Sequence, residues 1–153
     1  MAAYFLDASA LVKRYVTEKG SPWVTGLLDP AARNRLYVAR ITGVEVTAAL
    51  TRKERGGHLS AADATSALSL FQHDYVNRLR PVEITAALIA EAMKVARNHG
   101  LRGYDAVQLA ASIHANNRRV ARKLTPLVFV TADVSLLTAS ATEGLTTDDP
   151  NSH

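Results

Sequence analysis

Short apolar runs alternate along the chain with longer segments in which apolar residues recur every three to four positions. The apolar runs predict four buried strands, at Tyr4–Leu6, Leu36–Ala39, Pro81–Ile84 and Leu127–Thr131. Their hydrophobicity is continuous, whereas a strand with one face in water alternates apolar and polar residues. Such strands, separated by helices, are typical of a mainly parallel sheet covered on both faces. The pattern therefore predicts an α/β fold.

The segments between the strands have helical periodicity and carry residues typical of helix ends. The second helix is expected to have Ser21 as its N-cap and Pro22 as its first residue. The predicted helices are Ala8–Val16, Ser21–Asp29, Thr42–Arg55, Ser60–Arg78, Ala86–Asn98, Tyr104–Asn116 and Val134–Glu143.

Two polar segments fall outside these elements. Residues 116–126 are basic and are expected to be irregular, and the tail from about residue 146 is expected to be frayed. No repeat, low-complexity tract or linker divides the chain, so residues 1–153 are expected to form a single domain.

The composition narrows the possible chemistry. The chain has no cysteine, which excludes disulfides, thiolate zinc sites and thiol catalysis and fits a reducing cytoplasm. No apolar stretch approaches the length of a membrane span, and Asp7 interrupts the place where a signal peptide would be apolar. We therefore expect a cytoplasmic protein without a membrane segment.

The chain is basic, with a formal net charge of +4 that comes mostly from arginine. A solvated basic surface and a polyanionic partner, either nucleic acid or an acidic protein segment, explain this charge equally well. The arginines cluster at Arg33–Arg40, Arg52–Arg55, Arg78–Arg80 and Arg118–Lys123.

Four acids stand where predicted helices begin. Asp7 follows the first strand, Glu45 lies in the first turn after the second strand, Asp105 opens the helix after residue 103, and Asp133 follows the last strand. In open α/β sheets the functional crevice lies beyond the carboxyl ends of the strands. This rule places Asp7 and Asp133 near each other.

Each acid alone also has a purely structural explanation. Asp7, Asp105 and Asp133 could stabilise helix N-termini by roughly 0.3–1 kcal/mol each. Thr42 and Glu45 have the spacing of a capping box. The acids nevertheless have apolar neighbours, which favours a pocket over simple surface caps.

Four carboxylates in one pocket would repel each other and raise their pKa values. A hard divalent cation with oxygen ligands, Mg²⁺ or Mn²⁺, relieves such repulsion. No histidine stands at ligand spacing to these acids, so zinc is not expected. A pocket of this kind can hold a scissile phosphate and activate a water as the nucleophile.

The chain resembles the PIN-domain nucleases, and specifically the VapC-type toxins of bacterial type II toxin–antitoxin systems. The resemblance spans nearly the whole chain, and its four blocks come in the order of the family. Together they are specific, although each alone is weak. The matching blocks are Phe5–Ser9, Val44–Leu50, Leu101–Ala110 and Phe129–Asp133.

The resemblance implies a three-layer α/β/α sandwich and a Mg²⁺- or Mn²⁺-dependent endoribonuclease that hydrolyses RNA phosphodiester bonds. It also implies that Asp7, Glu45, Asp105 and Asp133 form the acidic quartet that binds metal and catalyses the reaction. The expected partners are an RNA substrate, a small cognate antitoxin and a second copy of the chain in a homodimer.

Further residues match the family or depart from it. Ser9 matches a small hydroxyl residue beside the first acid, and Thr131 matches the hydroxyl residue before the last acid. The basic segment 117–126 is longer than the family's connection. It is either a solvated loop or an arm that guides RNA.

Two other functional classes stay open. A PIN-like module could bind RNA or protein without cutting, although such a binder would not need to sustain four repelling acids. A phosphatase or receiver domain could use Asp7 as a covalent nucleophile. This fits poorly, because Ser9 stands where a haloacid-dehalogenase-type site has its second acid.

Several other side chains are expected to have structural roles. Trp23 is assigned to the core or to a partner groove, and Tyr104 to packing. The five histidines are scattered along the chain, and none is assigned to catalysis.

Overall fold

A five-stranded parallel sheet forms the centre of the computed structural model, which describes residues 1–153. The strand order is β3-β2-β1-β4-β5, and all four neighbouring pairs are parallel. The predicted parallel sheet is thereby confirmed. The strands are β1 (Ala3–Leu6), β2 (Arg35–Ala39), β3 (Leu79–Val82), β4 (Val128–Val130) and β5 (Thr146–Asp148).

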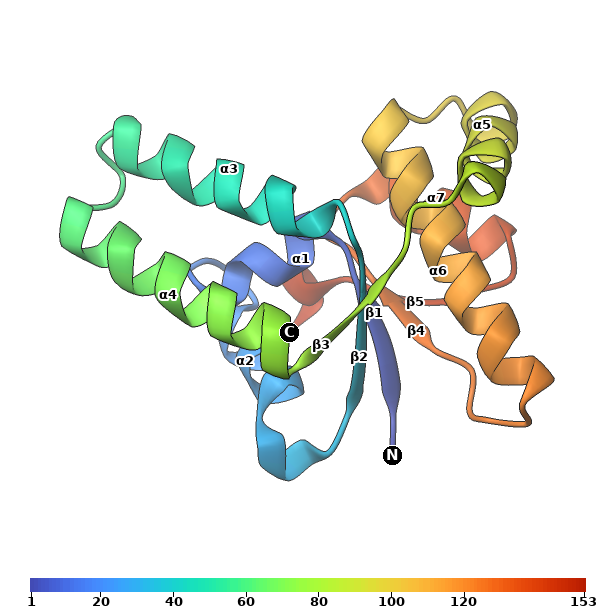
Figure 1. Cartoon of the computed structure of the whole chain (residues 1–153), viewed down its shortest axis with the longest axis horizontal. Coiled ribbons are helices and arrows are strands. Elements are labelled where there is room, and N and C mark those ends of the chain that lie inside the picture. The colour runs from blue at the N-terminus through green and yellow to red at the C-terminus, as the bar shows by residue number, and fades with distance from the viewer.

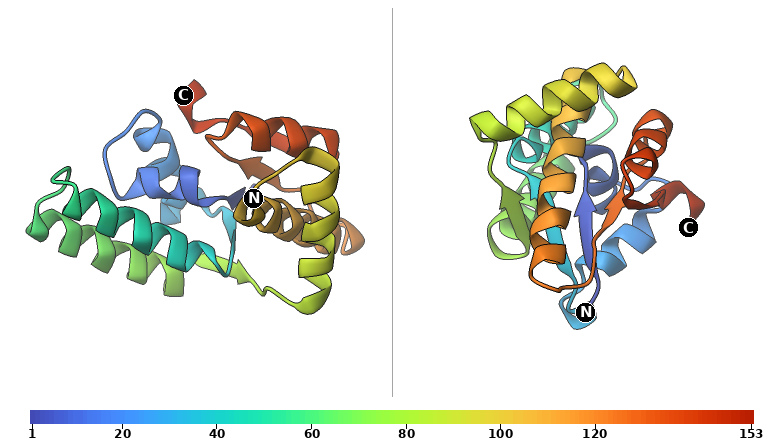
Figure 2. Two further views of the ribbon diagram at one scale, coloured as in Figure 1. Left: turned by 90° about the horizontal axis from the view of Figure 1, so that it is seen from above. Right: turned by 90° about the vertical axis from the view of Figure 1, so that its right-hand side faces the viewer.

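Helices cover both faces of this sheet (Figures 1 and 2), with α1 to α4 on one face and α5 to α7 on the other. This confirms the three-layer α/β/α sandwich. The α-helices are α1 (Ala8–Leu11), α2 (Ser21–Leu28), α3 (Thr42–Arg55), α4 (Ala61–Asn77), α5 (Ala86–His99), α6 (Gly103–Ala121) and α7 (Val134–Thr142). Short 3₁₀ turns are η1 (Val12–Arg14), η2 (Pro30–Ala32) and η3 (Pro150–Ser152).

The strands divide the core into two clusters because successive side chains of a strand point to opposite faces. Leu6 and Val130 belong to the cluster under α1 to α4, whereas their neighbours Phe5 and Phe129 belong to the cluster under α5 to α7. The two phenylalanine rings pack with their centroids 5.7 Å apart. This alternation explains why the strands read as continuous apolar runs.

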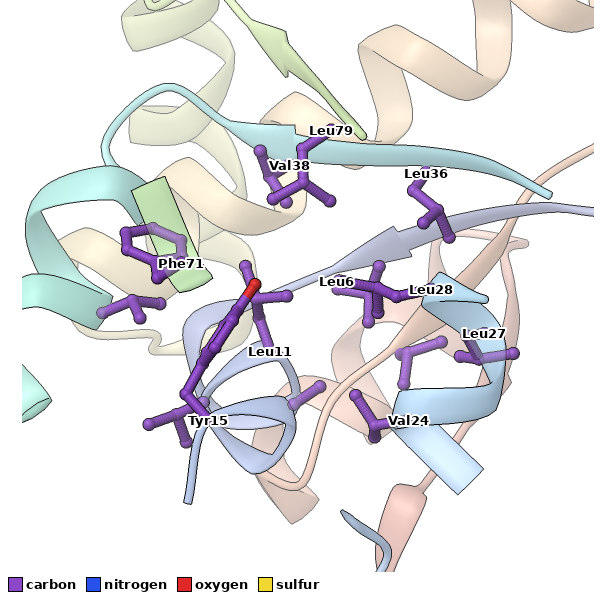
Figure 3. Packing of buried hydrophobic residues seen from close by; sticks show 14 of the residues in the cluster. Leu6, Leu11, Tyr15, Val24, Leu27, Leu28, Leu36, Val38, Phe71 and Leu79 are labelled. Atoms are coloured by element: carbon purple, nitrogen blue, oxygen red, sulfur yellow. The ribbon is translucent and has the colours of Figure 1, made fainter. Parts of the chain in front are cut away.

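Figure 3 shows the first of these clusters from close by. Leu6 from β1 and Leu36 and Val38 from β2 pack together with Leu11 of α1 and Leu28 of α2. All five side chains are buried. The cluster fixes the end of β1 and the start of α1, which is where Asp7 lies.

The first two helices differ from the prediction. The helix expected to reach Val16 ends at Leu11 and tightens into η1, which lets the Tyr15 hydroxyl donate to Asp74 Oδ2 at 3.0 Å. Ser21 is the first residue of α2 and not its N-cap. Gly20 holds the N-cap position, while Ser21 Oγ donates to the Val16 carbonyl at 3.0 Å.

Two later elements are also displaced. The third strand begins at Leu79, two residues before the expected Pro81, and it tolerates this proline because β3 is an edge strand. Helix α6 continues past Asn116 to Ala121, so the expectation of an irregular segment is wrong for its first half. Arg119 stabilises the extra turn, since its Nε donates to the Thr125 carbonyl at 2.7 Å.

The polar tail is part of the sheet, so the prediction that it is frayed is wrong. Residues 146–148 form β5 and pair with β4, and Thr131 donates its backbone N–H to the Asp148 carbonyl at 3.2 Å. His153 stacks on the Trp23 ring with centroids 4.0 Å apart. The Thr-Thr-Asp sequence of β5 is too short and polar to give a strand signal.

None of the helices combines the length and the hydropathy needed to cross a bilayer.

Substitution of Gly20 tests how the tail docks. Gly20 has φ +84°, and a Cβ there would lie 2.2 Å from the Pro150 carbonyl oxygen. Gly57 has φ +77° but has no atom within 4 Å of such a Cβ. We expect Gly57→Ala to cost about 1–2 kcal/mol for the left-handed backbone alone, and Gly20→Ala to cost about 1–3 kcal/mol more.

The measurement is urea unfolding of both variants beside the wild type. Equal losses for Gly20→Ala and Gly57→Ala would show that residues 150–153 do not pack against α2 in solution.

Candidate active site

The four predicted acids lie at one edge of the sheet. Asp7 follows β1, the central strand, and Asp133 lies just beyond its neighbour β4. Glu45 is in the first turn of α3, the helix that follows β2 on the other side of β1, and Asp105 is in the first turn of α6. β2 and β4 lie on opposite sides of β1, and open α/β sheets form their crevice where the strand order reverses in this way.

The Asp7 carboxylate is the most buried of the four, with the residue only 4% exposed. It accepts hydrogen bonds from Ser9 Oγ at 2.7 Å and from the Ala10 N–H at 2.9 Å, and Thr131 Oγ1 donates to its second oxygen. Burial raises the pKa of Asp7 to about 6, although these hydrogen bonds lower it and Asp105 raises it further. The carboxylate is therefore rigidly held and electrostatically destabilised.

Ser9 and Thr131 also connect the ends of β1 and β4. Ser9 Oγ accepts the Ala132 N–H at 3.0 Å, and Thr131 Oγ1 accepts the Asp133 N–H at 3.1 Å. One hydroxyl, that of Thr131, thus touches both Asp7 and the backbone of Asp133. These contacts fix the two acids relative to each other.

Glu45 does not form a capping box with Thr42. Helix α3 begins after Ile41, and the Thr42 hydroxyl is buried against Gln108 at 2.8 Å. The Glu45 carboxylate instead accepts a hydrogen bond from Gln108 Nε2 at 2.6 Å. The structural explanation of Glu45 as a simple capping residue is therefore wrong.

Gln108 is the site residue that the sequence did not reveal. It lies three residues after Asp105, on the same face of α6, and this spacing is the one signal that could have indicated it. The pKa of Glu45 is raised mainly by burial and also by Asp7 and Asp105, while the Gln108 hydrogen bond lowers it. Gln108 Oε1 is buried without a partner, so its amide is oriented towards Thr42 and Glu45 at some cost.

Asp105 connects the remaining acids electrostatically. Its pKa is raised mainly by burial and further by Asp133, while Arg102 lowers it. Asp133 is the N-cap of α7 and accepts the Leu136 N–H at 3.0 Å. Asp133 caps α7 and Asp7 caps α1, and both residues also belong to the acidic cluster.

The donor chemistry of the cluster fits a hard divalent cation. Three of its four carboxylates have raised pKa values, and a cation would relieve both the repulsion and the desolvation that raise them. Oxygen donors alone match Mg²⁺ or Mn²⁺. No three His, Asp or Glu side chains are close enough together in this structure to hold an ion between them.

A partly apolar groove of about 430 Å³ adjoins the acids between α1, α3 and the start of α6. Tyr104 borders it and is 64% exposed, so the prediction that this ring has a packing role is wrong. Val44, beside Glu45, also lines the groove and is exposed. Its lining residues are Ala8, Ser9, Val12, Ile41, Val44, Glu45, Ala48, Ala49, Arg52 and Tyr104.

Trp23, His153 and His99 have structural partners. Trp23 is half-buried and stacks on His153, whose ring nitrogen lies 2.9 Å from Asp148. His99, at the end of α5, lies 2.7 Å from Glu143.

The family profile of the PIN domain matches residues 4–133. The chain therefore belongs to the PIN-domain family. Its relatives include Ribonuclease VapC45 and Ribonuclease VapC49 from two strains of Mycobacterium tuberculosis. Each is 36% identical over 113 residues, which cover 74% of this chain and 76% of the relative.

Solved structures share the fold at lower identity. PAE2754 from Pyrobaculum aerophilum superimposes with a TM-score of 0.64 and 22% identity, covering 99% of this chain and 91% of the other. VapBC2 from Rickettsia felis, solved bound to a DNA fragment from its promoter, gives a TM-score of 0.63 and 15% identity, with 96% and 98% covered. These likenesses support the α/β sandwich.

The raised pKa of Asp7 predicts how stability depends on pH without metal. Burial raises the pKa of Asp7 from 3.8 to about 6 in the folded state, so the folded protein binds this proton more tightly than the unfolded chain does. The fold is therefore most stable below pH 3.8, and this contribution to stability is lost as pH rises through about 6. The loss amounts to about 3 kcal/mol at neutral pH. We expect Asp7→Asn to be more stable than wild type at neutral pH in EDTA, with the gain disappearing on acidification.

Urea unfolding across this pH range measures the difference between the two proteins. A wild type as stable as Asp7→Asn at neutral pH would show that the Asp7 carboxylate is not destabilised in the fold.

Proposed function

We propose that the protein is a metal-dependent endoribonuclease and the toxin of a toxin–antitoxin pair. The observation that carries this proposal is the buried, electrostatically strained Asp7 at the same sheet edge as Glu45, Asp105 and Asp133. The relatives named as ribonucleases, at 36% identity, support an RNA substrate.

The side chains divide the work in this proposal. Asp7 and Asp105 would be the main ligands of Mg²⁺ or Mn²⁺, and Asp133 would bind the ion through water or hold a second ion. A bound Mg²⁺ or Mn²⁺ supplies activation of a water and neutralisation of the scissile phosphate. Glu45 completes the shell or positions the attacking water.

The surrounding residues prepare these carboxylates. Ser9, Thr131 and the Ala10 N–H hold Asp7 in one orientation, so no reorganisation is needed when substrate arrives. Gln108 fixes Glu45 through a 2.6 Å hydrogen bond. The raised pKa of Glu45 suits it to accept a proton from the attacking water.

The antitoxin proposed as the partner binds at the same surface as the acids. The groove beside the acids offers apolar side chains such as Val44 and Tyr104 to a segment of the antitoxin, with Arg52 at its border. A homodimer remains part of the proposal.

RNA cleavage by Asp7→Asn tests the assignment. We expect wild type to cut RNA in Mg²⁺ or Mn²⁺ and to stop in EDTA, and we expect Asp7→Asn to lose roughly 100-fold or more of the rate because a metal ligand is removed. The matched control is Asp63→Asn, an exposed acid at the start of α4, which should cut as wild type does.

Undiminished cleavage by Asp7→Asn would contradict the site. RNA binding without cleavage by the wild type, under every metal condition, would instead support the non-catalytic module.

A further inference from the structure

A second pocket, the α6 arginine pocket, lies on the face of the sheet that α5 to α7 cover. Its volume is about 370 Å³, and it lies between the edge strand β3 and the C-terminal half of α6. In the right-hand view of Figure 2, α6 runs alongside the strands of the sheet. The side chains that define the pocket are Tyr37, Arg80, His114, Arg118, Arg119 and Arg122.

The pocket carries a large excess of positive charge. Glu83 is its one lining carboxylate, and Arg40, from outside the pocket, already pairs with it. Arg80, Arg118 and Arg122 are exposed and make no ion pair or side-chain hydrogen bond. Three guanidinium groups are therefore free to bind an anion.

Arg119 gives the strongest indication of a ligand, because it is a buried cation without a carboxylate partner. The residue is 6% exposed, and its Nε and Nη1 donate to the Thr125 carbonyl at 2.7 Å and to the Tyr37 hydroxyl at 3.1 Å. Nη2 makes no hydrogen bond to a protein atom, and Arg119 lines the pocket. The guanidinium also lies over the Tyr37 ring, 5.7 Å from its centroid, but no carboxylate neutralises its charge, and a bound anion would do so.

The spacing of the charges favours a phosphate-bearing strand. His114 and Arg118 are four residues apart and share one face of α6, and Arg122 is the C-cap four residues further on. Guanidinium forks match phosphate oxygens bidentately. Asp105 opens the same helix, and fourteen residues separate it from Arg119, which places the two about 21 Å apart along the axis.

We propose that the α6 arginine pocket binds phosphate groups of the RNA strand at a distance from the bond that is cleaved. This inference rests on the proposed function for the identity of the polyanion. A strand held at Arg119 and cut beside Asp105 lies along α6, so the pocket selects for substrates long enough to span both places.

The test measures RNA binding in EDTA, so it does not depend on cleavage. A fluorescein-labelled, unstructured RNA of about 20 nucleotides is titrated at several salt concentrations, and its anisotropy is recorded. For the double variant Arg118→Gln, Arg122→Gln we expect about tenfold weaker binding and a salt slope smaller by about 1.4, because two phosphate contacts are lost.

The matched control is Lys19→Gln, Arg55→Gln, which removes two exposed charges from the opposite face of the sheet. It should bind the long RNA as wild type does. Wild-type affinity and salt slope in the Arg118, Arg122 variant would overturn the proposal, as would an equal loss in the control or no binding by the wild type.

Competition with decaglutamate separates RNA from an acidic protein segment. If decaglutamate displaces the RNA as effectively as an unlabelled decanucleotide does, the assignment to phosphate is overturned. If the wild type binds RNA through Arg118 and Arg122 but never cleaves it in Mn²⁺, the proposed function fails while the pocket stands.

Discussion

The burial of the Asp7 carboxylate is the constraint on which the rest of the site depends. Asp7 directly follows the apolar strand β1 and lies at the edge of the core, where desolvation raises its pKa to about 6. Ser9, Thr131 and the Ala10 N–H offset part of that penalty and leave the carboxylate with one orientation. Asp105 then adds repulsion, so the fold concentrates negative charge at this edge of the sheet.

The layers of the fold follow from the same arrangement. Because β1 is central and all strands are parallel, the segments after β2, β1 and β4 emerge side by side. Phe5 and Leu6 face opposite clusters and hold β1 between the two helical layers. The position of Asp7 is therefore set by packing on both faces of the sheet.

The sheet and the position of the four acids at one edge of it could be predicted because their signals are local. Apolar runs mark the strands, and each acid directly follows a strand or opens a helix. The fifth strand, Thr146–Asp148, could not be predicted, since it is polar and depends on pairing with β4. The role of Gln108 could not be predicted because it depends on the first turn of α3 meeting α6 in the folded chain. The end of α6 could not be placed because Arg119 is stabilised by Thr125 and Tyr37.

We propose that these carboxylates share a metal ion, and anomalous scattering from crystals soaked in Mn²⁺ is the most direct test. We expect a strong peak at about 2–2.2 Å from carboxylate oxygens of both Asp7 and Asp105. A saturating soak that gives no peak at Asp7, or a peak only at some other surface, would show that these carboxylates do not share a metal ion.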